Sequence, residues 1–241
     1  MDAATISRHL LLFAILNAFS FSSAFAVVPH YVIEGVTDSV AEPLVPEYRI
    51  KSDGSVSLRV CYNWSCARKK VLTFTAEDMA GVGQQMAQCS DKTLYDRLQR
   101  IRIGIWQMEL LAQKYLPVLA NDREINVEDK DLEGRTDCVD NASNSTTYLH
   151  ILQDISELKT WSVELPQVRD LLRVTDVHWT AVVRDQQNGQ LWSVDSWFRP
   201  NGHLPFVMPL ADWVDEKKGW EPPFDRFNPY PRYINELCKP P

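Results

Sequence analysis

The chain has 241 residues, a length that supports one sizeable hydrophobic core or at most two small domains. Hydrophobic residues make up 45% of the chain, which is the proportion found in ordinary globular proteins. The formal net charge of -7 argues against a nucleic-acid partner, because phosphate binding requires a basic surface.

Residues 1–26 have the pattern of a secretory signal peptide. Arg8 precedes an apolar run over residues 10–16, and Ala24-Phe25-Ala26 supplies small residues at the cleavage site. The run is short for a membrane span, although an uncleaved anchor is the alternative. We expect a mature chain that begins near Val27, is periplasmic or secreted, and has no stable membrane insertion after cleavage.

The cysteines follow this segment, and their number is odd, which leaves at least one thiol unpaired or pairs it between chains. Cys61 and Cys66 are close enough in sequence to close a hairpin, and Cys89 with Cys238 is then a plausible second bridge. Four cysteines allow three pairings, so other connectivities stay open. On this pairing Cys138 is the free thiol.

The first part of the mature chain, residues 27–74, is predicted to form an extended arm and a small sheet. Residues 48–50 and 56–60 alternate apolar and polar side chains around Asp53-Gly54, which predicts a hairpin. Residues 71–74 continue as another strand. We expect a structural role for this sheet.

Two helices are predicted next. The first begins at Thr75 with acidic residues in its first turn and continues over residues 79–86. The second helix ends near Pro117 and has apolar residues at helical spacing, namely Leu94, Leu98, Ile101, Ile105, Met108, Leu111, Ala112, Tyr115 and Leu116.

An acidic loop over residues 121–134 follows the second helix, and it lacks the ligand spacing of an EF-hand calcium site.

Cys138 is predicted to lie in the first turn of a further helix, which Thr136 or Asp137 can cap. Unpaired backbone N–H groups and the helix macrodipole favour a thiolate there, whereas the carboxylates of Asp137 and Asp140 oppose it. A cationic partner is therefore required. The next turns carry small residues that allow another element to approach closely, namely Ala142, Ser143, Ser145 and Thr146.

Two strands with a turn between them are predicted over residues 177–183 and 191–197, with the turn at 186–189. Antiparallel pairing across this turn places His178 and Asp195 on one face of the sheet. They are then diagonal neighbours whose side chains can meet.

Cys138, His178 and Asp195 together match the residue types of a nucleophile, its base and the group that orients the base. Each has a structural alternative. Cys138 could be a buried thiol or a disulfide partner, and His178 a hydrogen-bonded core histidine. Asp195 is harder to explain structurally, since a buried carboxylate needs a partner. The backbone N–H of Cys138 could donate to an oxyanion, with a second donor among Asn126, Arg135 and Asn141.

Three motifs resemble the transglutaminase-like branch of the papain-like cysteine peptidases. They are Thr136-Asp-Cys-Val-Asp-Asn-Ala142, Val177-His-Trp-Thr-Ala-Val182 and Leu191-Trp-Ser-Val-Asp-Ser-Trp197. The chain is most similar to bacterial exported transglutaminase-like cysteine proteinases, whose motif is Asp-Cys-Glu-Asp. Val139 replaces the acidic residue of that motif. Some members use carboxylates there to bind calcium, and the loss of this carboxylate argues against calcium dependence, so we expect no cofactor.

The resemblance implies an α+β fold in which the catalytic helix packs on an antiparallel sheet. Residues 27–241 would form a single papain/transglutaminase-like domain, with a helical region and catalytic core over 75–241. The implied function is an exported cysteine hydrolase or acyl-transferase that acts on amide bonds of a protein or peptide through a Cys138 thioester. A cell-wall peptide amidase using the same three residues is one alternative. Another is a non-catalytic binding module with an aromatic surface of Trp179, Trp192, Trp197, Trp213 and Trp220.

Three Asn-x-Ser/Thr sequons begin at Asn63, Asn141 and Asn144. The last two lie on the predicted Cys138 helix, where a glycan would prevent packing. This conflict favours a bacterial periplasmic or secreted protein that does not meet the N-glycosylation machinery.

Overall fold

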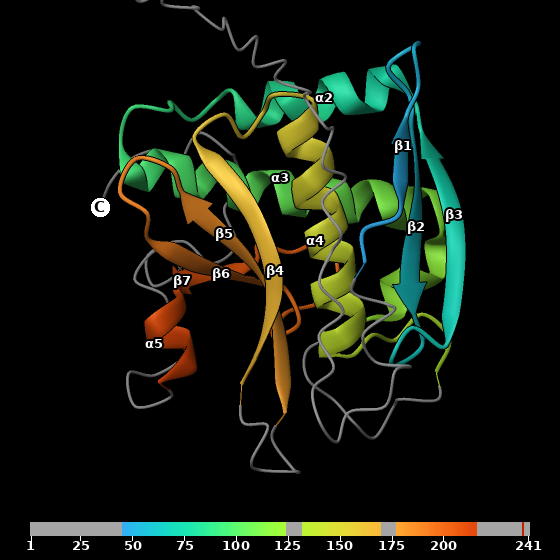
Figure 1. Ribbon diagram of the computed structural model, residues 1–241. Helices are drawn as coiled ribbons and strands as arrows, with labels where there is room; N and C mark the ends of the chain where they lie inside the picture. The colour runs from blue at the N-terminus through green and yellow to red at the C-terminus, as the bar shows by residue number, and fades with distance from the viewer. Residues whose placement is uncertain (1–44, 124–131, 170–176, 216–237, 239–241) are drawn as a thin grey trace, which may run out of the picture. The chain divides into compact units, whose positions relative to one another are not determined.

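Two antiparallel sheets and several helices make up the described part of the computed structural model, residues 45–123, 132–169, 177–215 and 238 (Figure 1). These residues all belong to one compact unit, Val32–Pro241. The arrangement confirms the predicted α+β class. The proposed signal peptide and the arm up to residue 44 lie outside the described residues, as does the tryptophan at position 220.

The smaller sheet contains β1 (Tyr48–Ile50), β2 (Val56–Tyr62) and β3 (Arg68–Phe74) in that order. The first two strands form the predicted hairpin, with Ile50 paired to Val56. Gly54 has a φ of 82° in the connecting turn, a conformation that glycine adopts without a steric penalty.

The helices α2 (Ala76–Met86) and α3 (Leu94–Tyr115) follow, as predicted. Thr75 caps α2 and forms a reciprocal capping box with Asp78, which explains where this helix begins. Pro117 follows the end of α3 and starts a short 3-10 helix, η2 (Pro117–Asn121), because proline has no N–H to continue the α-helical ladder.

The larger sheet has the order β4 (Trp161–Arg169), β5 (His178–Asp185), β6 (Leu191–Asp195) and β7 (Phe206–Pro209), and α5 (Leu210–Val214) follows. The strands β5 and β6 confirm the predicted pair. The mixed sequence pattern of β4 predicts no definite element. Its Pro166 is accommodated because β4 is an edge strand with an irregular register between Glu164 and Gln167.

The helix α4 (Cys138–Asp154) packs against β4, β5 and β6 of the larger sheet, against β1 and β2 of the smaller one, and against α3 (Figure 1). Its small residues make this close packing on several sides feasible, and all four that the sequence indicates are buried: Ala142, Ser143, Ser145 and Thr146. The position of α4 places its first residue, Cys138, beside the larger sheet.

Both predicted disulfides are present, Cys61–Cys66 and Cys89–Cys238, and Cys138 is a free, buried cysteine. The second disulfide joins positions 149 residues apart, so it restricts the unfolded chain far more than the first does. Within the described ranges, no helix is both long enough and apolar enough to cross a membrane.

Candidate active site

Asp137 is the N-cap of α4, which settles the choice between Thr136 and Asp137. The Asp140 N–H donates to Oδ1 of Asp137 at 2.9 Å, and the Asp137 N–H donates to Oδ2 of Asp140 at 3.2 Å. The chain reaches this cap through Gly134, where a Cβ atom would lie 1.8 Å from the carbonyl oxygen of Val118. Only glycine fits there, so the approach of the chain to Cys138 is fixed.

The sulfur of Cys138 lies against the start of β5. Its thiol is 3.9 Å from the carbonyl oxygen of Val177, and the Trp179 N–H donates to the sulfur. These two residues flank His178 in the sequence. The side chain of Cys138 also packs in a small apolar cluster with Trp179 and Trp197. The structure therefore brings the cysteine to the strand that carries the histidine.

His178 and Asp195 form the contact that the sequence predicts. The Nε2 atom of His178 is 2.6 Å from Oδ2 of Asp195, and both side chains are almost completely buried. The register explains the contact. Ala181 pairs with Val194, so Asp195 lies across from the position two residues beyond His178.

Trp213 on α5 completes the surroundings of Asp195, and sequence reasoning did not place it in the site. Its Nε1–H donates to Oδ2 of Asp195 at 2.9 Å, the same oxygen that contacts His178. Arg169 lies over the Trp213 ring at 4.6 Å and donates to the Trp213 carbonyl oxygen at 2.8 Å. A buried aspartate with two donors on one oxygen is held in a single orientation.

The histidine ring lies among aromatic rings. Its centroid is 4.9 Å from Trp197, 4.8 Å from Phe198 and 5.6 Å from Trp213. These rings limit the access of water to the His178–Asp195 contact and so strengthen its electrostatics. Trp179, Trp192 and Trp213 are themselves buried, which means that these three do not form the exposed recognition surface of the binding-module alternative.

Burial raises the pKa of the Cys138 thiol to about 12, and the negative charges of Asp137 and Asp195 act in the same direction. The N–H groups of Trp179 and of Cys138 itself oppose this shift without cancelling it. The helix N-terminus therefore does not by itself lower the pKa of this thiol below its usual value. Loss of the proton to water would place a net negative charge in a buried site that already holds carboxylates.

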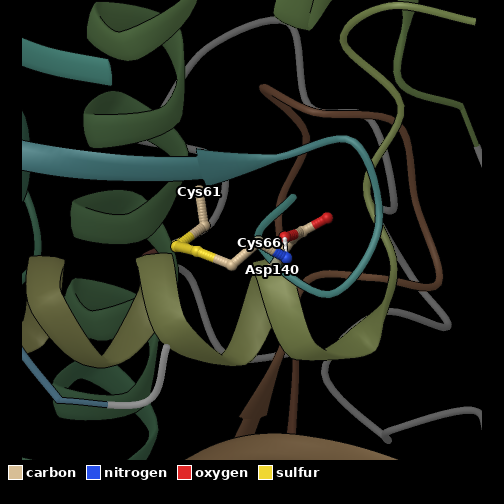
Figure 2. Close-up of side chains that lie close together, drawn as sticks. All are labelled: Cys61, Cys66 and Asp140. Carbon is tan, nitrogen blue, oxygen red and sulfur yellow. Dashed lines mark hydrogen bonds between the residues drawn. A yellow bond between two sulfur atoms is a disulfide. The ribbon is translucent and has the colours of Figure 1, made fainter. Parts of the chain in front are cut away.

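Ligand atoms of Cys61, Cys66 and Asp140 lie within 4.8 Å of one another (Figure 2). The two sulfurs are joined in a disulfide, however, so this group offers no thiolate to a metal ion. The oxygens of Asp137 and Asp140 accept hydrogen bonds from backbone N–H groups, which compete with calcium for the same lone pairs. Most of the acidic loop, residues 124–131, lies outside the described residues.

A buried polar chain lies behind the site and involves Asn141, one of the candidate oxyanion donors. Its Nδ2 donates to Oγ1 of Thr136 at 2.6 Å and to the carbonyl oxygen of Asp137 at 3.0 Å, and its Oδ1 accepts from Ser196 at 2.9 Å. The side-chain nitrogen and oxygen of Asn141 therefore both make hydrogen bonds, and the bond from Ser196 connects α4 to the residue after Asp195. Arg135 is buried and donates to the carbonyl oxygen of Asn121, and position 126 is outside the described residues.

The sequon asparagines all make interior contacts. The Asn63 Oδ1 atom accepts from the Gly134 N–H at 2.9 Å, and Asn144 both accepts from and donates to the backbone of Cys61. A glycan on Nδ2 of Asn141 or Asn144 would displace hydrogen bonds that hold α4 in place. N-glycosylation at Asn141 or Asn144 is therefore incompatible with this packing of α4.

Ser196 connects this chain to Glu109, a completely buried glutamate on α3. The Gly202 N–H donates to its Oε2 at 2.9 Å, and Ser196 hydrogen-bonds to the same carboxyl group. Burial raises the pKa of Glu109 to about 8. The side chain is therefore mostly protonated at neutral pH, and the protein keeps a proton there that the unfolded chain releases.

Replacement of Glu109 by glutamine should stabilise the protein at alkaline pH. The unfolded carboxyl ionises from about pH 4.5, whereas the folded one ionises near pH 8, so the wild type loses stability between these values. We expect Glu109→Gln to exceed the wild type by about 4 kcal/mol at pH 8 and by less than about 1 kcal/mol at pH 5, measured by urea unfolding. Glu133→Gln, at an exposed ion pair with Arg68, serves as control. An equal gain at both pH values would show that Glu109 is already ionised in the folded protein.

Comparison with known proteins adds no assignment. No protein-family model, curated protein or solved structure matches the chain. A function must therefore be inferred from the site itself and from the motifs that form it.

Proposed function

We propose that the protein is an exported cysteine hydrolase or acyl-transferase that acts on amide bonds of protein or peptide substrates. Cys138 is the nucleophile, His178 the base and Asp195 the group that orients the base. The buried 2.6 Å contact between His178 and Asp195, next to the strand segment that holds the Cys138 sulfur, carries this proposal. The resemblance to transglutaminase-like cysteine proteinases supports the same roles and a papain/transglutaminase-like fold.

The high pKa of the thiol is compatible with this chemistry, because it describes loss of the proton to water. Transfer of the proton from Cys138 to His178 creates a thiolate and an imidazolium together and leaves the net charge of the buried site unchanged. Asp195 stabilises the imidazolium through Nε2, which leaves Nδ1 as the nitrogen for proton exchange. The thiolate therefore exists as one half of an ion pair.

The reaction then follows from these roles. The Cys138 sulfur attacks the amide carbon, and the backbone N–H at the start of α4 donates to the oxyanion. The C–N bond breaks as His178 returns its proton to the departing amine, leaving a thioester on Cys138. Water or a second amine then attacks the thioester, which yields hydrolysis or acyl transfer and frees the thiol.

An exported location is part of the proposal. Two disulfides form and persist in an oxidising compartment, which fits the periplasm or the extracellular space. The signal-peptide pattern of residues 1–26 supports the same destination.

Alkylation of the native protein by iodoacetamide tests the ion pair. Cys138 is the one free thiol among the five cysteines, so mass spectrometry of the protein reports this site alone. We expect measurable alkylation at pH 7 in the wild type and a rate at least about 100-fold lower in His178→Gln, because a thiol with a raised pKa holds almost no thiolate without the imidazole.

His150→Gln is the matched control, since His150 lies on α4 but takes no part in the proposed site. Its alkylation rate should equal that of the wild type. Equally slow alkylation of the wild type and His178→Gln would contradict the proposed function and leave Cys138 as an ordinary buried thiol.

A further inference from the structure

The segment that connects β2 to β3 has an unusual backbone. Four consecutive residues other than glycine, Asn63, Trp64, Ser65 and Cys66, have φ angles of 66°, 63°, 50° and 58°. L-residues avoid this left-handed region, and a run of four needs outside support. The Cys61–Cys66 disulfide closes the segment, which we call the disulfide turn and define as residues 61–66.

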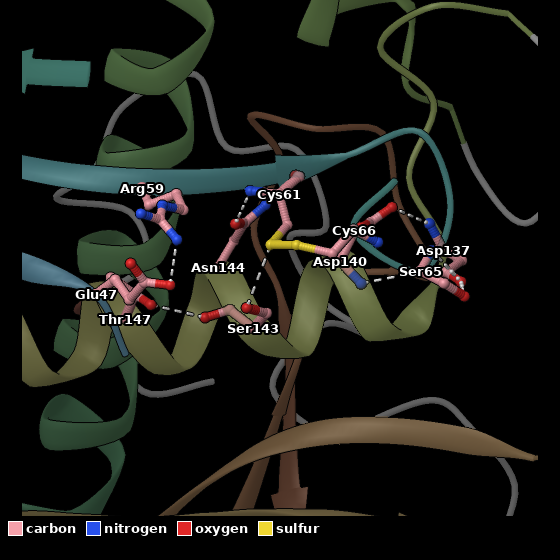
Figure 3. The surroundings of a disulfide bond; sticks show 10 residues. All are labelled: Glu47, Arg59, Cys61, Ser65, Cys66, Asp137, Asp140, Ser143, Asn144 and Thr147. Atoms are coloured by element: carbon pink, nitrogen blue, oxygen red, sulfur yellow. Dashed lines mark hydrogen bonds and ion pairs between the residues drawn. A yellow bond between two sulfur atoms is a disulfide. The ribbon is translucent and has the colours of Figure 1, made fainter. Parts of the chain in front are cut away.

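Successive backbone N–H groups in such a conformation point to one side and form a concave site for an anion. In the disulfide turn they converge on the carboxylates that flank Cys138. The Ser65 N–H donates to Oδ2 of Asp137 at 2.9 Å, and the Cys66 N–H donates to Oδ1 of Asp140 at 2.6 Å (Figure 3). The Ser65 hydroxyl adds a third donor at 3.1 Å, and the Trp64 N–H also bonds to Asp140.

The disulfide turn is also fastened to α4 at its other end. The Cys61 N–H donates to Oδ1 of Asn144 at 2.8 Å, and Nδ2 of Asn144 donates to the Cys61 carbonyl oxygen at 2.9 Å (Figure 3). The Ser143 hydroxyl lies 3.7 Å from the Cys61 sulfur. The disulfide therefore lies over the first turns of α4, close to Asp140 (Figure 2). It closes the turn whose Ser65 and Cys66 N–H groups donate to the two carboxylates.

These contacts matter for Cys138 because the charges near its sulfur are mostly negative. Asp137 and Asp140 lie at the start of its own helix, and the charge of Asp195 acts on it from the sheet. Asp137 is the strongest of the charged groups that disfavour the thiolate. Donors that share the Asp137 charge weaken its field at the sulfur, and so they assist the His178 imidazolium, which is the cationic partner of the thiolate.

We propose that the disulfide turn is a positioning element for the active site. Its backbone N–H groups hold Asp137 and Asp140, and thereby keep the first turn of α4 in place and the Cys138 sulfur reactive. The Cys61–Cys66 disulfide takes no part in bond making, yet the reactivity of Cys138 depends on it. This inference rests on the proposed function, since it concerns the same thiolate–imidazolium pair.

The test compares the two disulfides of the protein. The double variant Cys61→Ser with Cys66→Ser should lower the iodoacetamide alkylation rate of Cys138 at pH 7 by at least about tenfold, because one unit of rise in the thiol pKa corresponds to tenfold less thiolate. The matched control, Cys89→Ser with Cys238→Ser, opens the longer disulfide loop, whose cysteines pack in the main hydrophobic core and not in the cluster of Cys138. It should lower the melting temperature more while leaving the alkylation rate unchanged.

A rescue separates electrostatics from simple loosening. Asp137→Asn removes the charge but keeps a good N-cap, so it should restore most of the alkylation rate in the Cys61→Ser, Cys66→Ser background. Ser65→Ala, which removes the exposed hydroxyl donor and leaves the disulfide, should lower the rate in the same direction by a smaller factor. If the double variant does not fold, the alkylation rate of Ser65→Ala tests the inference in its place.

The outcomes are distinguishable. If the wild type shows no alkylation that depends on His178, the proposed function fails. If alkylation of the wild type does depend on His178, but the double variant and Ser65→Ala both keep the full rate, the disulfide turn has no role in positioning. In that case this inference alone is overturned. A loss of rate that Asp137→Asn does not restore would also overturn the electrostatic role assigned to the turn.

Discussion

Replacement of Cys138 by alanine is expected to lower the rate of amide cleavage by at least about 10⁴-fold, because no other group in the proposed site can form the thioester. The unfolding free energy should change by only about 1 kcal/mol, since the substitution removes one sulfur atom from a small apolar cluster. A denatured, unstructured protein substrate such as casein, supplied with a fluorescent primary amine, allows peptide release, ammonia release and amine incorporation to be measured together.

These three readouts also distinguish hydrolysis of the thioester from transfer of its acyl group to an amine. Peptide or ammonia release without amine incorporation would indicate a hydrolase, and incorporation would indicate an acyl-transferase. Cys138→Ser provides a second variant that keeps a side chain able to donate a hydrogen bond, and it should be almost as inactive as Cys138→Ala, because an alcohol is a much weaker nucleophile than a thiolate here. Unchanged activity in Cys138→Ala would end the assignment of Cys138 as nucleophile.

Removal of Arg97 is expected to have the largest effect on stability. Its two terminal nitrogens bind both oxygens of Asp185 at 2.7 and 2.9 Å, and its guanidinium lies 5.3 Å from the centre of the Trp161 ring. The exposed fractions of the two side chains are 4% and 0%. Arg97→Ala would leave a buried carboxylate without its partner, so we expect the unfolding free energy to fall by about 3–5 kcal/mol in denaturant titrations.

Arg184→Ala is the matched control, because Arg184 is the neighbour of Asp185 and pairs with Glu164 at a partly exposed site. Its loss should cost no more than about 1 kcal/mol. Arg97→Met combined with Asp185→Asn removes both charges while keeping an acceptor for the Gln187 N–H, and it should recover most of the lost stability. Equal effects of Arg97→Ala and Arg184→Ala would show that burial does not determine the strength of this pair.

The local parts of the fold follow from short-range rules in the sequence. Thr75 starts α2, Pro117 follows the end of α3, and a turn with Gly54 joins β1 to β2, because caps, prolines and turns act within a few residues. The contact between His178 and Asp195 was also predictable, since the two residues are only 17 positions apart on strands joined by a tight turn. Register within a hairpin fixes which side chains face each other.

The sequence alone therefore determined most helices and strands and the histidine–aspartate pair of the site, and it indicated Cys138 as the free cysteine through one of the three possible pairings of the other four. Only the tertiary structure decided the direction of the Cys138 pKa shift, since a helix start by itself lowers the pKa of a thiol, whereas burial of the sulfur near Asp137 and Asp195 raises it. The tertiary structure also decided the hydrogen-bond partners of three carboxylates. Asp137 and Asp140 accept from the disulfide turn about 70 residues away, and Asp195 accepts from Trp213 on α5. Desolvation and long-range hydrogen bonds depend on every element packed around a group, and no spacing within one segment of the chain records them.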